Sequence, residues 1–200
     1  MINLLGKIPR RVTVACSGGL DSMAFLHFLL KGKRLVDLAY FNHDTQHARQ
    51  AEDFVKIYAA KHRLNLVIGR VKGTKGKLSL EEFWRNERYD FLSSHGSKFI
   101  ITCHHLDDAV ETWLMSAFHG NPKLIPYKRD SNIYRPLLLT GKSSIRDYAI
   151  RKKVEWIEDP SNKQTTHTRN YVRHNILPHI IKVHPGIRTT IRKKLISAYK

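Results

Sequence analysis

Short apolar runs alternate along the chain with longer segments whose apolar residues recur every three or four positions. The short runs have the length and composition of buried strands, and they cover residues 12–16, 35–42, 64–69 and 99–103. The longer segments have the spacing of amphipathic helices, and they cover residues 20–31, 51–59, 79–91 and 106–118. This alternation predicts an α/β fold, in which a mostly parallel sheet carries helices on both faces.

The last third of the chain has a weaker pattern. Residues 120–132 are polar and irregular, residues 133–138 form another extended run that a proline ends, and residues 143–152 have helical spacing. The 200 residues, of which 42% are hydrophobic, are enough for one substantial core. We expect one domain over residues 1–165 and a basic helical extension over residues 166–200, packed on the same domain.

The charge of the chain changes this picture. The formal net charge is +18, and half of it lies after Asp159, where nine Lys and Arg residues follow and no acidic residue occurs. Such an excess favours a polyanionic partner, above all nucleic acid. We expect RNA contacts from polar and basic residues that recur at helical spacing in this extension, which suits binding of phosphate and sugar more than reading of bases. They are Arg169, Asn170, Arg173, His174, Arg192, Lys193 and Lys194.

Other classes are disfavoured by what the sequence lacks. No apolar run reaches the roughly eighteen residues of a membrane span, and no secretory leader is recognisable, so we expect a soluble intracellular protein in the cytoplasm or an organelle stroma, with no membrane partner. The two cysteines, Cys16 and Cys103, form no C-x-x-C pair. They are therefore interpreted as buried reduced thiols and not as part of a disulfide framework or zinc site.

The first candidate site lies where the predicted strand 12–16 meets the predicted helix 20–31. The connection reads Ser17, Gly18, Gly19, Leu20, Asp21 and Ser22. Adjacent glycines permit positive φ and a close approach to a ligand, and N–H groups at a helix start attract phosphate. A carboxylate at Asp21 suits such a site when Mg²⁺ lies between it and the phosphates. The pattern indicates a Mg-nucleotide site; the alternative is a plain helix start capped by Ser or Asp.

A second polar cluster follows the strand 99–103. It contains His104, His105, Asp107, Asp108 and Glu111, with Asp107 and Glu111 one helical turn apart. The two aspartates suit the positive end of a helix, but the further carboxylate on the same face also suits an amine or Mg-ATP. A dedicated transition-metal site is the less favoured alternative, because no further ligand pattern supports it.

A third candidate is the pair Arg85 and Arg88, which share a face of the helix that Ser79 caps. An exposed arginine pair is most often solvated surface. The pair alone therefore indicates no function, and a role for it can be inferred only from the motifs around it.

The hexapeptide at residues 17–22 resembles the S-G-G-x-D-S loop of the PP-loop ATP pyrophosphatases. Together with later motifs in the same order, the chain resembles the tRNA(Ile)-lysidine synthetase family over nearly its whole length. The other matching pieces are Asn42-His43, Leu78–Glu82 with Arg85 and Arg88-Tyr89, His104–Asp108 with Glu111-Thr112, Arg135–Leu137, and Glu158–Asn162 running to Arg169-Asn170, Arg173-His174 and Leu177-Pro178.

The resemblance implies a PP-loop fold and an enzyme that uses ATP and Mg²⁺. Such an enzyme adenylates the C2 oxygen of the wobble cytidine in an isoleucine tRNA with a CAU anticodon. The ε-amine of free L-lysine then displaces AMP, which yields lysidine. It also implies that this chain corresponds to the catalytic domain, since longer members carry additional C-terminal domains.

The resemblance also implies roles for single residues. The loop at residues 17–22 binds ATP, and Asp21 helps to hold Mg²⁺. Arg85 stabilises negative charge on the α-phosphate or the cytidine oxygen. Asp107 orients the lysine ammonium and accepts its proton, with Glu111 sharing that task. His105 either assists proton transfer or braces the loop.

Three departures from the family pattern bear on these roles. The family continues Asn-His-Gly-Leu-Arg, whereas this chain has Asp44-Thr45-Gln46 after His43. The glycine-rich turn after the second cluster is replaced by residues 119–122, and Asp-Asp-Gln has become Asp108-Ala109. Two alternatives stay open beside the synthetase: a tRNA thiolase of the same superfamily, which the cysteine spacing disfavours, and a non-catalytic RNA-binding module that keeps the fold.

Overall fold

The structure is a computed structural model, and it describes residues 1–160 and 168–199. The predicted boundary between residues 165 and 166 lies outside the described residues, and so do Ser161 and Asn162 of the motif that begins at Glu158. Within the described part of the chain, no helix combines the length and the apolar character that crossing a bilayer requires.

One sheet organises the described residues, and it has six strands. In chain order they are β1 (Arg11–Ala15), β2 (Leu35–Asn42), β3 (Leu66–Arg70), β4 (Ile100–Ile101), β5 (Lys128–Arg129) and β6 (Ile133–Tyr134). Across the sheet they lie in the order β3-β2-β1-β4-β6-β5, and only β5 runs antiparallel to its neighbour. The mostly parallel α/β fold predicted from the apolar pattern is therefore confirmed.

Helices follow or precede most strands. They are α1 (Leu20–Lys31), α2 (Gln46–Lys61), α3 (Leu80–Ser94), α4 (Leu106–Ala117), α5 (Lys142–Arg151), α6 (Thr168–Tyr171), α7 (Leu177–Val183) and α8 (Ile187–Tyr199), together with a 3₁₀ turn η1 (Pro136–Leu139) and a π-helical turn η3 (Val172–Ile176). Ser79 caps α3 by accepting the Glu82 N–H at 3.2 Å, as its position in the sequence predicts.

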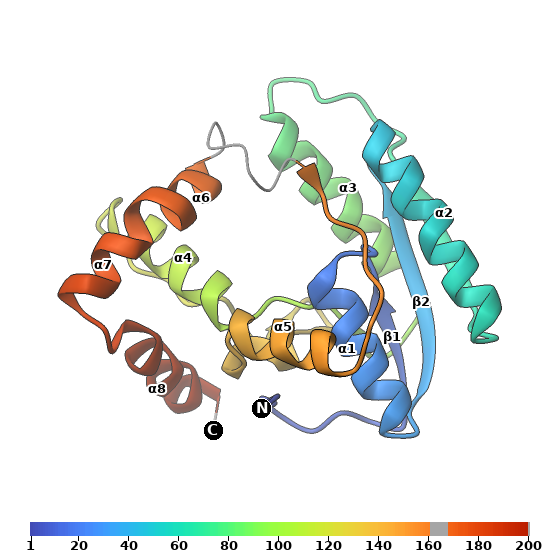
Figure 1. The fold of residues 1–200 in the computed structure, drawn as a ribbon. Helices are drawn as coiled ribbons and strands as arrows, with labels where there is room; N and C mark the ends of the chain where they lie inside the picture. Colours follow the sequence, from blue (N-terminus) through green and yellow to red (C-terminus); the bar gives the residue numbers. More distant parts are fainter. Residues whose placement is uncertain (161–167, 200) are drawn as a thin grey trace.

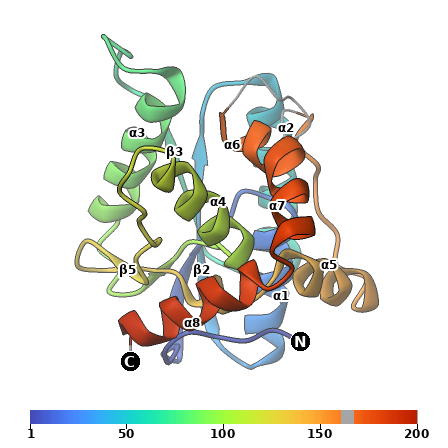
Figure 2. The same cartoon turned by 90° about the vertical axis from the view of Figure 1, so that its left-hand side faces the viewer.

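Alternate side chains of the central strands enter two different cores. Leu38 and Tyr40 of β2 pack with α1, α2 and α5, whereas Ala39 between them packs with Tyr89 and Leu92 of α3. Figure 1 shows α1 and α5 side by side, and Figure 2 shows α3 on the opposite side of the strands. Since successive strand residues point to opposite faces, helices cover both faces of the sheet.

The extended prediction for residues 133–138 is wrong after Tyr134. Pro136 has no N–H to give to a sheet, and the chain turns there into the 3₁₀ turn η1, so β6 has only two residues. The strand predicted at residues 99–103 is correspondingly short, because β4 pairs with β6 over Ile100 and Ile101 alone. The residues after Ile101 are thereby freed to form a polar connection to α4.

The C-terminal helices pack on α4. Ile187, Ile191 and Leu195 of α8 are buried in one cluster with Leu106 and Val110 of α4. In Figure 2, α8 crosses the front of the molecule below α4, and α6 and α7 lie beside α4. The basic extension thus contributes an apolar stripe to the core, while Lys182, Lys193 and Lys194 are exposed.

Candidate functional site

The glycine loop, residues 17–22, joins β1 to α1 at the carboxyl edge of the sheet. Gly18 has φ +78°, and a Cβ there would lie 3.2 Å from Cγ2 of Ile157 and 3.3 Å from Cγ2 of Val55. Gly19 has φ −78° and lies in extended backbone, so only the first glycine needs its conformational freedom. The Ile157 N–H donates to the Gly18 carbonyl at 2.9 Å, which fixes the turn from outside.

The start of α1 has no side-chain cap among the described residues. The Ser22 hydroxyl donates to the Gly19 carbonyl at 2.9 Å and lies 3.3 Å from the Ser17 hydroxyl, so neither serine acts as the helix cap. The plain capped helix start, which was the alternative from the sequence, is not what the loop forms. The first-turn N–H groups of α1 therefore have no side-chain cap within the described residues, and N–H groups at a helix start attract phosphate.

Asp21 points from α1 toward α4. Its Oδ2 lies 3.6 Å from Nε2 of His105, while its Oδ1 is buried and has no hydrogen-bond partner among the described residues. A buried carboxylate oxygen without a partner is costly, and a divalent cation is a suitable partner for it. The geometry therefore fits Mg²⁺ at Asp21.

The first turn of α4 is built around His105, which is 1% exposed. The His105 N–H donates to Oδ2 of Asp108 at 2.9 Å, and Nδ1 of the His105 ring lies 3.4 Å from the same oxygen. Burial alone would lower the pKa of His105, but the carboxylates of Asp108 and Asp21 outweigh it and raise the pKa to about 9. Burial would raise the pKa of Asp108, but the charge and the backbone N–H of His105 outweigh it and lower that pKa to about 2. An ionised cluster thus connects the glycine loop to α4.

Asp107 and Glu111 face the C-terminal helices. Asp107 accepts the Lys142 N–H at 2.7 Å and the Arg188 guanidinium at 2.8 Å. Glu111, 1% exposed, accepts two bonds from Arg173, at 2.6 Å from Nε and at 2.9 Å from a terminal nitrogen. These groups line a cavity of about 440 Å³, here called the carboxylate cavity, whose other lining residues are Ser143, Leu177, Pro178 and Ile181.

The two carboxyl groups differ in basicity. Burial by itself raises the pKa of Asp107, but the Lys142 N–H and the Arg188 guanidinium outweigh it and leave that pKa below its usual range. For Glu111, burial dominates over Arg173 and raises the pKa. Glu111 is accordingly the more basic of the two carboxylates.

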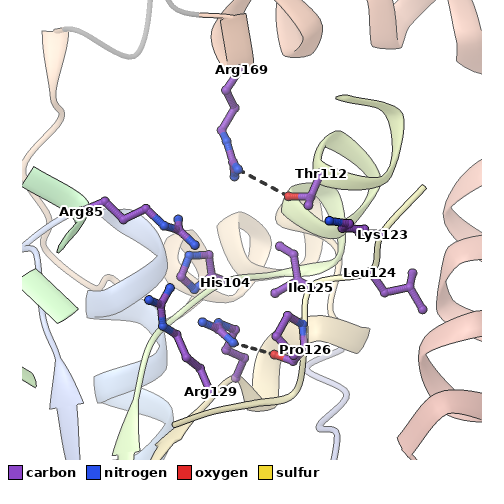
Figure 3. A pocket seen from close by; sticks show the side chains of 10 residues that line it. Arg85, His104, Thr112, Lys123, Leu124, Ile125, Pro126, Arg129 and Arg169 are labelled. Carbon is purple, nitrogen blue, oxygen red and sulfur yellow. Dashed lines mark hydrogen bonds between the residues drawn. The ribbon is translucent and has the colours of Figure 1, made fainter. Parts of the chain in front are cut away.

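Arg85 lies at a second cavity, on another side of α4. This cavity, here called the arginine cavity, has a volume of about 390 Å³ (Figure 3). It is lined by Arg85, His104, Thr112, Lys123, Leu124, Ile125, Pro126, Arg129, Arg135 and Arg169. Burial lowers the pKa of His104 to about 3, so its ring is neutral there.

If one small cleft gathered the substrates, as the motifs together imply, the loop, Arg85 and Asp107 would share it, but neither of the two cavities contains all three. Arg85 lines the arginine cavity, whereas Asp107 and Glu111 line the carboxylate cavity. The first turns of α4 lie between the two, because Thr112 faces one cavity and Asp107 the other. Helix α4 connects the glycine loop with both cavities, because its residues line the cavities and its N-cap His105 contacts Asp21.

Comparison with known proteins decides the family. A family model described as a PP-loop domain matches residues 3–180. The chain belongs to the PP-loop domain family. The glycine loop at residues 17–22, which resembles the S-G-G-x-D-S loop of such proteins, is called the PP-loop from here on.

Curated relatives confirm the resemblance to tRNA(Ile)-lysidine synthetases. A tRNA(Ile)-lysidine synthase from Persephonella marina is 36% identical over 199 residues, which is 90% of this chain and 44% of the relative. One from Photobacterium profundum is 31% identical and shares 96% of this chain and 48% of its own length. The chain thus spans just under half the length of these relatives.

A solved structure supports the PP-loop fold. A U34-tRNA thiolase from Methanococcus maripaludis, solved with its [4Fe-4S] cluster, superposes with a TM-score of 0.74 over 96% of this chain and 73% of the thiolase. At 17% identity the likeness concerns the fold alone.

The residues predicted to bind RNA lie in different surroundings. Arg169 donates to the Thr112 hydroxyl at 3.4 Å and lines the arginine cavity, whereas Arg173 is engaged with Glu111 and Asp108. Lys193 and Lys194 are exposed on α8. The remaining predicted residues, Asn170, His174 and Arg192, lie on the same C-terminal helices.

Sequence reasoning missed several residues that line the two cavities. Arg188 pairs with Asp107 across 81 positions, and no local pattern marks it. Lys123 and Arg129 lie in the segment described as irregular, where a run of basic residues was the only signal.

Both cysteines are free, and Cys103 is half-buried instead of fully buried as predicted. Burial raises the pKa of Cys16 and Cys103 above that of an ordinary thiol, so both are poor nucleophiles at neutral pH.

Proposed function

We propose that the chain converts the wobble cytidine of an isoleucine tRNA with a CAU anticodon to lysidine, using ATP and free L-lysine. The names of its curated relatives support this, as do the motifs that it shares with their family. The observation that carries the proposal is the first turn of α4, which touches the PP-loop and separates a cavity rich in arginine from one that holds two carboxylates. The first suits a nucleotide, and the second suits an amine.

ATP is proposed to bind at the PP-loop, with its phosphates on the first-turn N–H groups of α1 and the hydroxyls of Ser17 and Ser22. Gly18 and Gly19 keep the backbone open to those phosphates, and Leu20 starts the helix. Asp21 would hold Mg²⁺, which when bound offsets the charge of the triphosphate. The buried Oδ1 of Asp21 supports this role.

The target cytosine is proposed to enter the arginine cavity beside Arg85. A fixed guanidinium there stabilises the negative charge that develops on the α-phosphate as the C2 oxygen attacks it and pyrophosphate leaves. Leu124, Ile125 and Pro126 provide an apolar wall for the base. Because His104 is neutral, it adds no further charge next to the base.

Lysine is proposed to bind in the carboxylate cavity. The guanidinium groups of Arg188 and Arg173 hold Asp107 and Glu111 in the positions that a substrate ammonium would contact. Arg188 is the group that we expect to give way, since its side chain is 41% exposed and that of Arg173 only 21%. Asp107 then orients the ammonium, while His105 braces the PP-loop against α4.

Glu111 is proposed to accept the proton that the ammonium must lose before it can react, because its raised pKa makes it the better base. The cytosine and the ε-amine are proposed to meet at the first turn of α4, next to Asp21. There the ε-nitrogen forms a bond to C2 of the cytosine, the bond from C2 to the adenylated oxygen breaks, and AMP leaves. The exposed lysines of α8, with Arg169, Asn170, His174 and Arg192, are proposed to hold the tRNA backbone.

The decisive experiment incubates the full chain with ATP, labelled lysine and an isoleucine tRNA transcript with a CAU anticodon. The expected result is label in the tRNA and a wobble nucleotide with the mass of lysidine. A matched transcript with U at the wobble position should take up none. RNA binding without lysine uptake would contradict the proposal and favour a binding module, and sulfur uptake would favour a thiolase.

A further inference from the structure

The arginine cavity has more positive charge than the proposed reaction uses. Five cationic side chains line it, and its described lining contains no carboxylate. Arg85 comes from α3, Arg129 from β5, Arg135 from the residue after β6, and Arg169 from α6, while Lys123 lies between α4 and β5. Cations collected from five separate parts of the chain repel one another, and an anionic ligand removes that cost.

Tyr89 shows how closely these cations are gathered. The guanidinium carbon of Arg129 lies 3.8 Å from the centre of the Tyr89 ring, and those of Arg85 and Arg135 lie 5.2 Å and 6.0 Å away. A ring face attracts cations, so it holds them in place without cancelling their charge. Figure 3 shows the side chains of Arg85 and Arg129 pointing toward His104 from two sides of the cavity.

Arg135 has a structural task in this cluster. It is 2% exposed, and it donates to the Pro126 carbonyl at 2.6 Å and to the Tyr89 hydroxyl at 3.1 Å. These bonds hold the segment that carries the apolar wall and Lys123. Because Arg85 is assigned to the proposed reaction and Arg135 to this structural task, the cations left to meet a further ligand are Lys123, Arg129 and Arg169.

Their position separates them from the PP-loop. The loop follows β1, whereas Arg129 lies on β5 at the far edge of the sheet, with β4 and β6 between. No PP-loop residue lines the arginine cavity. Lys123 is exposed, and Nε of Arg129 lies 3.4 Å from the exposed carboxylate of Asp130, a surface pair that a stronger anion can displace.

We propose that Lys123 and Arg129, with Arg169, form a binding site for one phosphodiester of the RNA, next to the nucleotide whose base enters the arginine cavity. The identification of the ligand as RNA rests on the proposed function. It assigns RNA binding to the α4–β6 connection, in addition to the basic C-terminal helices. Both RNA and ATP carry a phosphate that such a site could bind, and the test distinguishes between them.

The test compares the wild type with the double variant K123A/R129A. Binding of the tRNA is measured over a range of salt concentrations, and KM is measured for ATP. We expect the Kd for tRNA to rise about tenfold at moderate salt and the slope of log K against log salt to fall by about one, since one phosphate contact is lost. The KM for ATP should change less than twofold.

The matched control is the double variant R10A/K98A. Arg10 and Lys98 are exposed at the amino-terminal ends of β1 and β4, so their loss removes the same charge far from the cavity. A tRNA Kd that changes equally in both variants would overturn the inference, as would a KM for ATP that rises while tRNA binding stays unchanged. Both variants should melt within a few degrees of the wild type.

The two proposals fail in different ways. If the wild type makes lysidine but K123A/R129A binds tRNA normally, the phosphodiester site is wrong and the proposed function stands. If the wild type takes up no lysine but binds tRNA, and K123A/R129A alone loses this affinity, the phosphodiester site stands and the proposed function is wrong.

Discussion

His105 is held between two carboxylates, and this gives it an unusual titration. Its folded pKa of about 9 exceeds the ordinary 6.5, so its contribution to stability is complete below pH 6.5 and is lost as the pH rises through 9. We expect its ring resonances to titrate near pH 9 in an NMR experiment. A His105 that titrates at or below 6.5 would show that its Nδ1 serves only as the acceptor of the helix cap.

Asp108 is the partner that this behaviour depends on. Its folded pKa of about 2 lies below the ordinary 3.8, so its contribution is complete above pH 3.8 and is lost as the pH falls through 2. The pair is thus intact from about pH 4 to pH 9. Asp108→Asn should lower the pKa of His105 and cost about 3 kcal/mol of unfolding free energy at pH 7, measured by denaturant unfolding.

Arg188 competes with an incoming ammonium for Asp107. Arg188→Ala frees the Oδ1 of Asp107, so we expect the KM for lysine to fall about tenfold, the equivalent of one charge-assisted hydrogen bond. Arg188→Lys keeps a cation at that position and serves as the control. A KM for lysine that rises in Arg188→Ala would mean that the guanidinium helps to hold the substrate instead of occupying its place.

Asp107 and Glu111 should respond differently to loss of charge. Glu111→Gln removes the stronger base, and we expect kcat for lysine transfer to fall at least a hundredfold while ATP binding persists. Asp107→Asn should act mainly on the KM for lysine. Equal losses of kcat in both variants, measured by lysine uptake into tRNA, would contradict this division.

At the scale of the element, the PP-loop depends on one glycine more than on the other. Gly18→Ala places a Cβ at positive φ, 3.2 Å from Ile157, so we expect a loss of about 2 kcal/mol in stability and at least tenfold weaker ATP binding by calorimetry. Gly19→Ala is the control, because its nearest neighbour would be the Ser17 hydroxyl at 3.4 Å and its φ suits alanine. The stability loss in Gly19→Ala should be less than half of that in Gly18→Ala.

Helices and long strands could be predicted because their signals are local. The apolar spacing of residues 20–31 and 35–42 predicts α1 and β2 with the bounds that the structure has. The lengths of β4 and β6 could not be predicted, since each ends where its partner ends. The length of a strand depends on the strand that it pairs with, and a local sequence pattern does not identify that partner.

At the scale of the molecule, the C-terminal helices share a core with α4. Ile191 is fully buried between them, and we expect Ile191→Ala to cost about 3 kcal/mol. The loss should appear as one cooperative transition at a lower temperature in calorimetry. Two separate transitions would show that residues 168–199 fold as an independent unit.

The site could be predicted in its parts but not in its arrangement. The PP-loop and the cluster from His104 to Glu111 are contiguous, so the sequence displays them. The pairing of Arg173 with Glu111 and of Arg188 with Asp107 joins residues 62 and 81 positions apart. Such contacts depend on how helices pack, and so does the division into two cavities.

The bond from the Ile157 N–H to the Gly18 carbonyl bears on how the protein matures during translation. The PP-loop leaves the ribosome before Ile157, whose N–H bonds to Gly18 and which follows it by almost 140 residues. A nascent chain that ends before Ile157 carries the whole loop motif without its closing contact. The proposed nucleotide binding is therefore acquired only after Ile157 has emerged, shortly before the residues that are proposed to hold the tRNA backbone.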